Sequence, residues 1–101
     1  MTKEGNGQSI TYRVVISAQT RDLVLNLHQQ AIALGIGEAF LNAFREMYSR
    51  LQNHPLDFGE PLYRLPALHL KVFQAAISPL AVTYAVHEEM HLVFVRVFNL
   101  L

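Results

Sequence analysis

The sequence is 101 residues long, with 51% hydrophobic residues, no cysteine, and eight basic against eight acidic side chains. A chain of this length buries about 65% of its unfolded surface, so we expect one domain over residues 1–101, with residues 1–9 flexible. The lack of cysteine, of a transmembrane-length apolar run and of a signal-peptide pattern predicts a cytoplasmic protein that does not enter a membrane. Zero net charge argues against strong, non-specific binding of nucleic acid, because affinity for phosphate comes largely from Lys and Arg.

The first half of the chain predicts one strand followed by two helices. Apolar and polar residues alternate over residues 10–16, as in a strand with one buried face. Ser17 is a candidate N-cap for the next helix, whose apolar residues recur at helical spacing over residues 23–34. The two glycines of residues 35–37 break this pattern, and a second apolar stripe follows over residues 38–52. We therefore expect an antiparallel helical hairpin.

The second half reads as strands. Pro55 ends the second helix, because the residue before a proline disfavours the α region. A loop at 56–61 leads to a short, edge-like strand at 62–65. Three longer segments rich in β-branched and aromatic residues follow, and each predicts a strand: 69–77, 80–86 and 92–98. This order predicts an α+β fold in which an N-terminal strand and the helical hairpin pack on a twisted antiparallel sheet of about four strands.

The five residues between the last two predicted strands have two interpretations. His87-Glu88-Glu89-Met90-His91 matches the H-E-x-x-H pattern, in which two histidines on one helix face bind zinc and the glutamate acts as general base. The flanking residues favour strands instead, which makes the five residues a polar hairpin turn. We adopt the turn, expect no metal or cofactor, and keep a zinc-dependent hydrolase using His87, Glu88 and His91 as the minor alternative.

The order of these elements, together with several short motifs, resembles the RelE/ParE toxin superfamily of bacterial type II toxin–antitoxin (plasmid stabilisation) systems. The resemblance extends over residues 10–98, and the order and spacing of the motifs are its most specific feature. It implies a RelE/ParE-like fold and an antitoxin partner that wraps the toxin with a helix and a strand. The stretches that carry the resemblance are Tyr12-Arg13-Val14-Val15-Ile16-Ser17, residues 40–51, Asn53-His54-Pro55, Gly59-Glu60-Pro61-Leu62-Tyr63-Arg64-Leu65, Val82-Thr83-Tyr84 and Val93-Phe94-Val95.

The resemblance also implies where a site would lie. Members that cut messenger RNA on the ribosome use a cluster of Lys, Arg and often Tyr or His on the sheet and after its last strand. The arginine usually found three residues before the strand tyrosine is Ala81 here, and the final residues 99–101 are not basic. Metal-free RNA cleavage needs a general base, a general acid and cations, so the resemblance implies an incomplete RNase site. The candidate site residues, expected to contact phosphate, are Arg64, Lys71, Tyr84 and Arg96.

Several alternatives stay open from the sequence. The cellular target is the ribosome with its messenger RNA, or DNA gyrase, and a homodimer is possible. A non-toxic protein-interaction module of the same fold is the main alternative function. His69 and Lys71, two residues apart, are expected on one strand face, where they would present together to a phosphate or to solvent. Some apolar residues exceed what one sheet face needs and suggest a covering partner: Tyr63, Phe73, Phe94, Phe98, Leu100 and Leu101.

Overall fold

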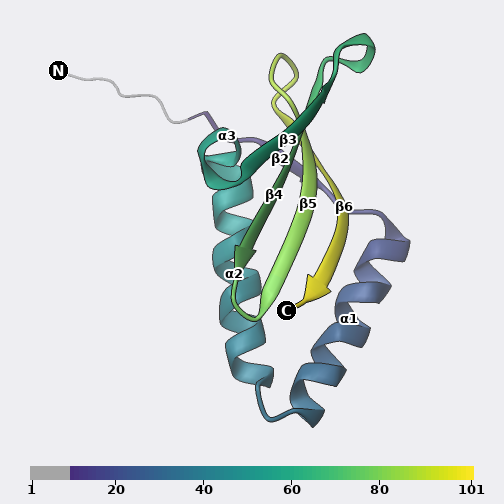
Figure 1. Ribbon diagram of the computed structural model, residues 1–101, viewed down its shortest axis with the longest axis vertical. Coiled ribbons are helices and arrows are strands. Elements are labelled where there is room, and N and C mark those ends of the chain that lie inside the picture. The colour runs from purple at the N-terminus through teal and green to yellow at the C-terminus, as the bar shows by residue number, and fades with distance from the viewer. Residues whose placement is uncertain (1–9) are drawn as a thin grey trace, which may run out of the picture.

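A mixed sheet with a helical hairpin on one face makes up the computed structural model, which describes residues 10–101 (Figure 1). The predicted α+β fold class is confirmed, whereas the predicted flexible stretch 1–9 lies outside the described residues. None of the helices within residues 10–101 is both long and apolar enough to cross a membrane. The elements are β2 (Arg13–Val15), α1 (Ala18–Ala33), α2 (Gly37–Asn53), α3 (Pro55–Phe58), β3 (Glu60–Leu65), a 3-10 helix (Pro66–Leu68), β4 (Leu70–Ile77), β5 (Leu80–His87) and β6 (Leu92–Leu100).

The sheet has five strands in the order β2-β6-β5-β4-β3. Strands β3 to β6 form the predicted antiparallel meander. The difference from the expected four-stranded antiparallel sheet lies at β2, which pairs with β6 in parallel and places Val14 opposite Val93. Only three of the seven residues at 10–16 form the ladder, and just before it the Tyr12 amide donates to the carbonyl of Gln52 at the end of α2, at 2.7 Å.

The helical hairpin begins and turns where the sequence predicts. The Ser17 hydroxyl accepts a hydrogen bond from the Thr20 amide at 3.1 Å, which satisfies one of the free N–H groups at the start of α1. After α1, Gly35 adopts φ +80°, a left-handed conformation that residues with a Cβ rarely adopt. The His28 ring of α1 stacks on the Phe40 ring of α2, with ring centroids 5.4 Å apart. This histidine therefore contributes to the contact between the two helices.

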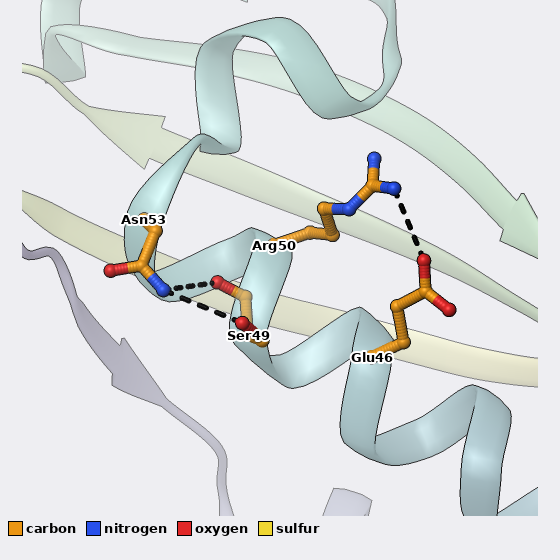
Figure 2. A network of polar contacts seen from close by, with 4 residues as sticks. All are labelled: Glu46, Ser49, Arg50 and Asn53. Carbon is orange, nitrogen blue, oxygen red and sulfur yellow. Dashed lines mark hydrogen bonds and ion pairs between the residues drawn. The ribbon is translucent and has the colours of Figure 1, made fainter.

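Side chains on the last turns of α2 stabilise its end (Figure 2). Arg50 pairs with Glu46 at 3.1 Å, and the Asn53 side-chain amide donates to the Ser49 carbonyl at 2.9 Å. The helix stops at Asn53, as the following proline predicts. The predicted loop after it contains one further helical turn, α3, which Pro55 begins because its fixed φ suits the first helical position.

The core lies between the helical hairpin and one face of the sheet, which we call the covered face. Strand β5 shows the alternation most clearly, since Leu80, Val82, Tyr84 and Val86 all belong to the core. A β-bulge interrupts the alternation on β6: Thr83 pairs with Val97 and Tyr84 with Val95, which leaves Arg96 as an extra residue. The other core residues include Leu27, Ala31, Phe40, Ala43, Met47, Leu51, Phe73, Ala75, Val93, Val95 and Phe98.

Candidate functional site

The sheet face opposite the helices, which we call the open face, carries mostly uncharged side chains, and the strand pairings place Arg13, Glu60, His87 and Arg96 on it as well. Its residues alternate with the core residues along each strand. Strands β3 to β6 contribute one arginine to this face, Arg96, and no lysine. Ala81, which stands where the resemblance predicts an arginine, lies on this face too. Its neighbours there include Tyr63, Val72, Gln74, Ala76, Thr83, Ala85, Phe94, Val97 and Asn99.

Arg96 is held across the open face by Tyr63. Its Nη1 donates to the Tyr63 hydroxyl oxygen at 2.8 Å. Because Arg96 lies on β6 and Tyr63 on β3, their side chains must reach over β5 and β4. Beneath them, Val72 and Ala85 are 0% and 4% exposed although no helix covers them. Although regular alternation would put Phe98 on the same face as Arg96, the bulge at Arg96 places Phe98 on the covered face.

Arg64 and Lys71 form a second cationic group, on the other side of the sheet. They are opposite each other in the β3–β4 pairing, and Lys71 lies on the same face as the core residue Phe73. The Lys71 Nζ lies 3.1 Å from a carboxylate oxygen of Glu88, which follows β5. This region is the end of the sheet where the β3–β4 and β5–β6 connections project beyond the helices (Figure 1). Arg64 and Lys71 together line two neighbouring cavities, of about 400 and about 300 Å³.

Tyr84 lies inside the core. It is 0% exposed, its hydroxyl donates to the Pro55 carbonyl at 2.7 Å, and its ring stacks between Phe58 and Phe73. Burial raises the pKa of Tyr84 to about 12, against a smaller opposing effect of the Gly59 backbone amide. A Cβ at Gly59 would lie 2.8 Å from the Tyr84 hydroxyl oxygen, so this close approach requires glycine. Tyr84 therefore anchors α3 to the sheet and has no access to a ligand.

The four predicted site residues thus do not form one cluster. Arg64 and Lys71 lie together, Arg96 lies on the opposite face, and Tyr84 is enclosed between the sheet and α3. Two partners were missed in reading the sequence, Glu88 and the hydroxyl of Tyr63. The two-residue turn at Ser78-Pro79 would have indicated Glu88, because this turn sets the register of β4 and β5 and places Lys71 opposite Val86. Glu88 lies two residues after Val86 and therefore falls on the same face as Lys71. No comparable local signal indicates the Tyr63–Arg96 contact.

The His87–His91 motif forms a hairpin turn. His87 pairs with Leu92 across β5 and β6, and His91 has φ +53°. The His87 Nδ1 accepts a hydrogen bond from the Met90 amide at 3.2 Å, whereas the His91 ring packs edge-on against Tyr12, with centroids 5.3 Å apart. The helical interpretation that a zinc hydrolase requires is therefore wrong. Residues 10–101 contain no group of three or more His, Cys, Asp or Glu side chains that could hold a metal ion.

His69 is also placed differently from the prediction. It follows the 3-10 helix with φ +57° and precedes β4, so it does not share a strand face with Lys71. Its ring lies 5.9 Å from that of His87, and it lines the smaller cavity beside Lys71. The reason is local, since a left-handed residue between the 3-10 helix and the strand cannot continue the β ladder. The ladder therefore starts at Leu70.

No protein-family model matches the sequence, and no curated protein matches it. Among solved structures, the fold resembles a chain of the archaeal RelE–RelB complex from Pyrococcus horikoshii OT3, with TM-score 0.60, 21% identity, and coverage of 89% of this chain and 94% of that chain. It also resembles a chain of the toxin–antitoxin complex RelBE2 from Mycobacterium tuberculosis, with TM-score 0.60, 21% identity, and coverage of 95% and 98%. The RelE/ParE-like toxin fold that the sequence predicts is thereby confirmed.

Proposed function

We propose that this protein is the toxin-like component of a type II toxin–antitoxin (plasmid stabilisation) system, which acts in the cytoplasm and is neutralised by an antitoxin. The observation that carries the proposal is the nearly full-length structural similarity to chains of two complexes that are themselves named RelE–RelB and toxin–antitoxin RelBE2. At this level of identity the similarity establishes the fold, and the function follows as an inference from the fold. Of the residues for which the sequence suggests a covering partner, Tyr63 and Leu101 are exposed, whereas Phe73 and Phe98 are in the core. Exposed Leu62 and Leu68, along and beside β3, add to the apolar surface that supports a covering partner.

We further propose that ribonuclease activity is weak or absent. Cutting RNA without a metal needs a positioned base, a positioned acid and cations around the phosphate. The open face carries two guanidiniums, those of Arg13 on β2 and Arg96 on β6, and no lysine, and Ala81 and Gln74 supply neither charge nor a titrating group. Its two titrating candidates for base and acid, Glu60 and His87, are opposite Gln74 and Leu70, four residues apart on β4, so they do not meet at one phosphate. Arg64 and Lys71 point to the other side of the sheet, so they cannot act on the same phosphate as Arg96.

With an incomplete nuclease site, a protein target is favoured over messenger RNA on the ribosome. A RelE/ParE-like fold suggests DNA gyrase as this protein target. The proposed contact residues are Arg64, Lys71 and Arg96. The same scarcity of catalytic groups favours a second candidate function, a non-toxic protein-interaction module. Both functions need a partner surface, and a homodimer would also provide one.

Inducible expression in a bacterial host with a growth readout tests the proposal. The toxin-like function predicts growth arrest that the Lys71→Ala and Arg64→Ala variants relieve. Arg50→Ala is the matched control, because Arg50 forms an exposed ion pair on α2 and lies outside the proposed contacts. Plasmid supercoiling and labelled-methionine incorporation measured after induction separate a gyrase target from a ribosomal one.

The opposite outcome is equally informative. Normal growth of cells that accumulate the soluble protein, with unchanged supercoiling and translation, would refute toxicity and leave the interaction module. If a small reading frame adjoins the gene, co-expression of its product should restore growth and co-purify with this chain. Failure of that product to bind would argue against the antitoxin partner.

A further inference from the structure

The cavity beside Arg64 and Lys71 combines an apolar floor with two cations. It has a volume of about 400 Å³, and its floor includes Phe73, which is 3% exposed, and the half-buried Leu56 of α3. Arg64 and Lys71 stand side by side at its border, because they are paired across β3 and β4. A ligand that fills this cavity would therefore present an apolar group next to a negative charge.

Lys71 already contacts one carboxylate, which comes from the protein itself. The Glu88 oxygen lies 3.1 Å from the Lys71 Nζ, and the two side chains are 48% and 32% exposed. Glu88 lies in the turn after β5 and lines the second cavity, not the one with the apolar floor. An ion pair this exposed contributes little stability, so an incoming anion can displace Glu88. Neither of the two ion pairs among residues 10–101 involves Arg64, whose planar guanidinium suits a carboxylate.

We propose that this cavity binds an acidic side chain of a protein partner that is flanked by an apolar side chain. In the absence of the partner, Glu88 pairs with Lys71 as an intramolecular substitute for the partner's carboxylate. When the partner binds, its carboxylate replaces Glu88 in the ion pair with Lys71. That the ligand belongs to a protein rests on the proposed function, whereas the anion site itself rests only on the cavity. A run of phosphates fits less well, because the carboxylates of Glu88 and Glu89 border the same cations.

The charge requirement can be tested without knowing the partner. The probe is 8-anilinonaphthalene-1-sulfonate, which joins an aromatic body to an anionic group, and its uncharged analogue N-phenyl-1-naphthylamine is the matched ligand control. Fluorescence titration of the full chain should show saturable binding of the sulfonate that Lys71→Gln and Arg64→Gln each weaken about threefold or more. The uncharged analogue should bind the wild type and both variants alike. Equal sulfonate binding by the wild type and both variants would overturn the anion site.

The role of Glu88 needs its own pair of variants. Glu88→Gln removes the competing carboxylate and should tighten sulfonate binding about threefold. Glu89→Gln removes the same charge from the same turn without breaking an ion pair, so its effect should be clearly smaller. If both variants bind the sulfonate equally more tightly, the gain comes from the lost negative charge in general, and the role of Glu88 as a substitute is refuted. Thermal unfolding followed by circular dichroism checks that each variant is folded, and Arg50→Gln controls for loss of a surface ion pair.

A competition experiment decides the class of ligand. End-blocked Phe-Glu-Leu peptide at millimolar concentration should displace the sulfonate probe, whereas Phe-Gln-Leu should not. A single-stranded RNA oligonucleotide that displaces the probe better than the acidic peptide would overturn the assignment to a protein partner. These results are independent of growth, so a cavity that binds acidic peptide in a protein that does not arrest cells would refute the toxin-like function and leave this site intact.

Discussion

The two faces of the sheet are made by the same strands and differ in almost every other respect. On β5, the covered face carries Val82, Tyr84 and Val86, all 1% exposed or less, whereas the open face carries Ala81, Thr83 and Ala85. The covered face is buried by α1, α2 and α3. The open face is shielded only locally, where the Tyr63 and Arg96 side chains meet above it. Large side chains are therefore used where another layer packs on them.

This difference follows from how each face is covered. The covered face must be filled at the density of a protein interior, so its residues are large, apolar and interdependent. The open face has no helical layer to fill, and it carries alanines, polar residues and the guanidiniums of Arg13 and Arg96.

The contrast predicts unequal costs for two phenylalanines on β6. Phe98 is 2% exposed on the covered face, where its ring lies 5.6 Å from that of Phe44. Phe98→Ala should lower the free energy of unfolding by about 3–5 kcal/mol, because it leaves a cavity in the core. Phe94→Ala, on the half-buried open face, should cost less than half as much. Urea unfolding followed by circular dichroism measures both, and equal losses would show that the open face is also covered in solution.

Loss of the buried Tyr84 hydroxyl should have the next largest effect on the free energy of unfolding. Tyr84→Phe leaves the buried Pro55 carbonyl without its donor, so we expect a loss of about 1–3 kcal/mol in the free energy of unfolding. Tyr63→Phe is the matched control on the open face, where water can replace the lost hydroxyl, and it should change stability much less. A larger effect at Tyr63 than at Tyr84 would contradict the assignment of Tyr84 as the anchor of α3.

The raised pKa of Tyr84 also predicts that the protein loses stability at alkaline pH. Its pKa in the folded protein is about 12, against an ordinary value of 10.0, so the unfolded chain releases this proton first. Stability should be unaffected below about pH 10 and should fall as the pH rises from 10 towards 12. Tyr12, whose pKa is raised by burial and then by the charge of Glu88, adds a loss in the same direction. Urea unfolding at pH 9 and pH 11 should show a smaller decrease in Tyr84→Phe than in the wild type.

The smallest expected effect belongs to the exposed contact on the open face. Arg96→Gln removes the hydrogen bond to Tyr63, but both groups are exposed and regain water, so stability should change by less than about 1 kcal/mol. Arg50→Gln, which removes an exposed ion pair on α2, should change stability by a similar amount. An Arg96→Gln loss as large as that of Tyr84→Phe would mean that the shielding of Val72 and Ala85 is part of the stabilising core.

Local patterns predicted the main helices and strands, though not α3 or the 3-10 helix, and they decided between the two interpretations of the His87–His91 motif. The cap at Ser17, the glycine turn at Gly35 and the helix end before Pro55 all depend on neighbouring residues, and the structure has them at those positions. The hairpin at His87–His91 follows from the β-branched residues on both sides. The site was only partly predictable: the predicted contact residues Lys71 and Arg64 lie together, but Tyr84, another predicted contact residue, is in the core.

The amino-acid sequence by itself determined the order of the elements, the α+β class and the positions of the turns, because each depends on residues within one or two turns of the chain. Only the tertiary structure decided which face each charged residue occupies. The parallel pairing of β2 with β6 joins segments far apart in the chain, and the bulge at Arg96 reverses the alternation in mid-strand. Such features arise from packing between distant segments, so the local spacing of apolar residues does not predict them. The separation of Arg96 from Lys71 and Arg64 likewise depends on how the strands pair, since Arg96 lies on the open face with Phe94 and Lys71 on the covered face with Phe73.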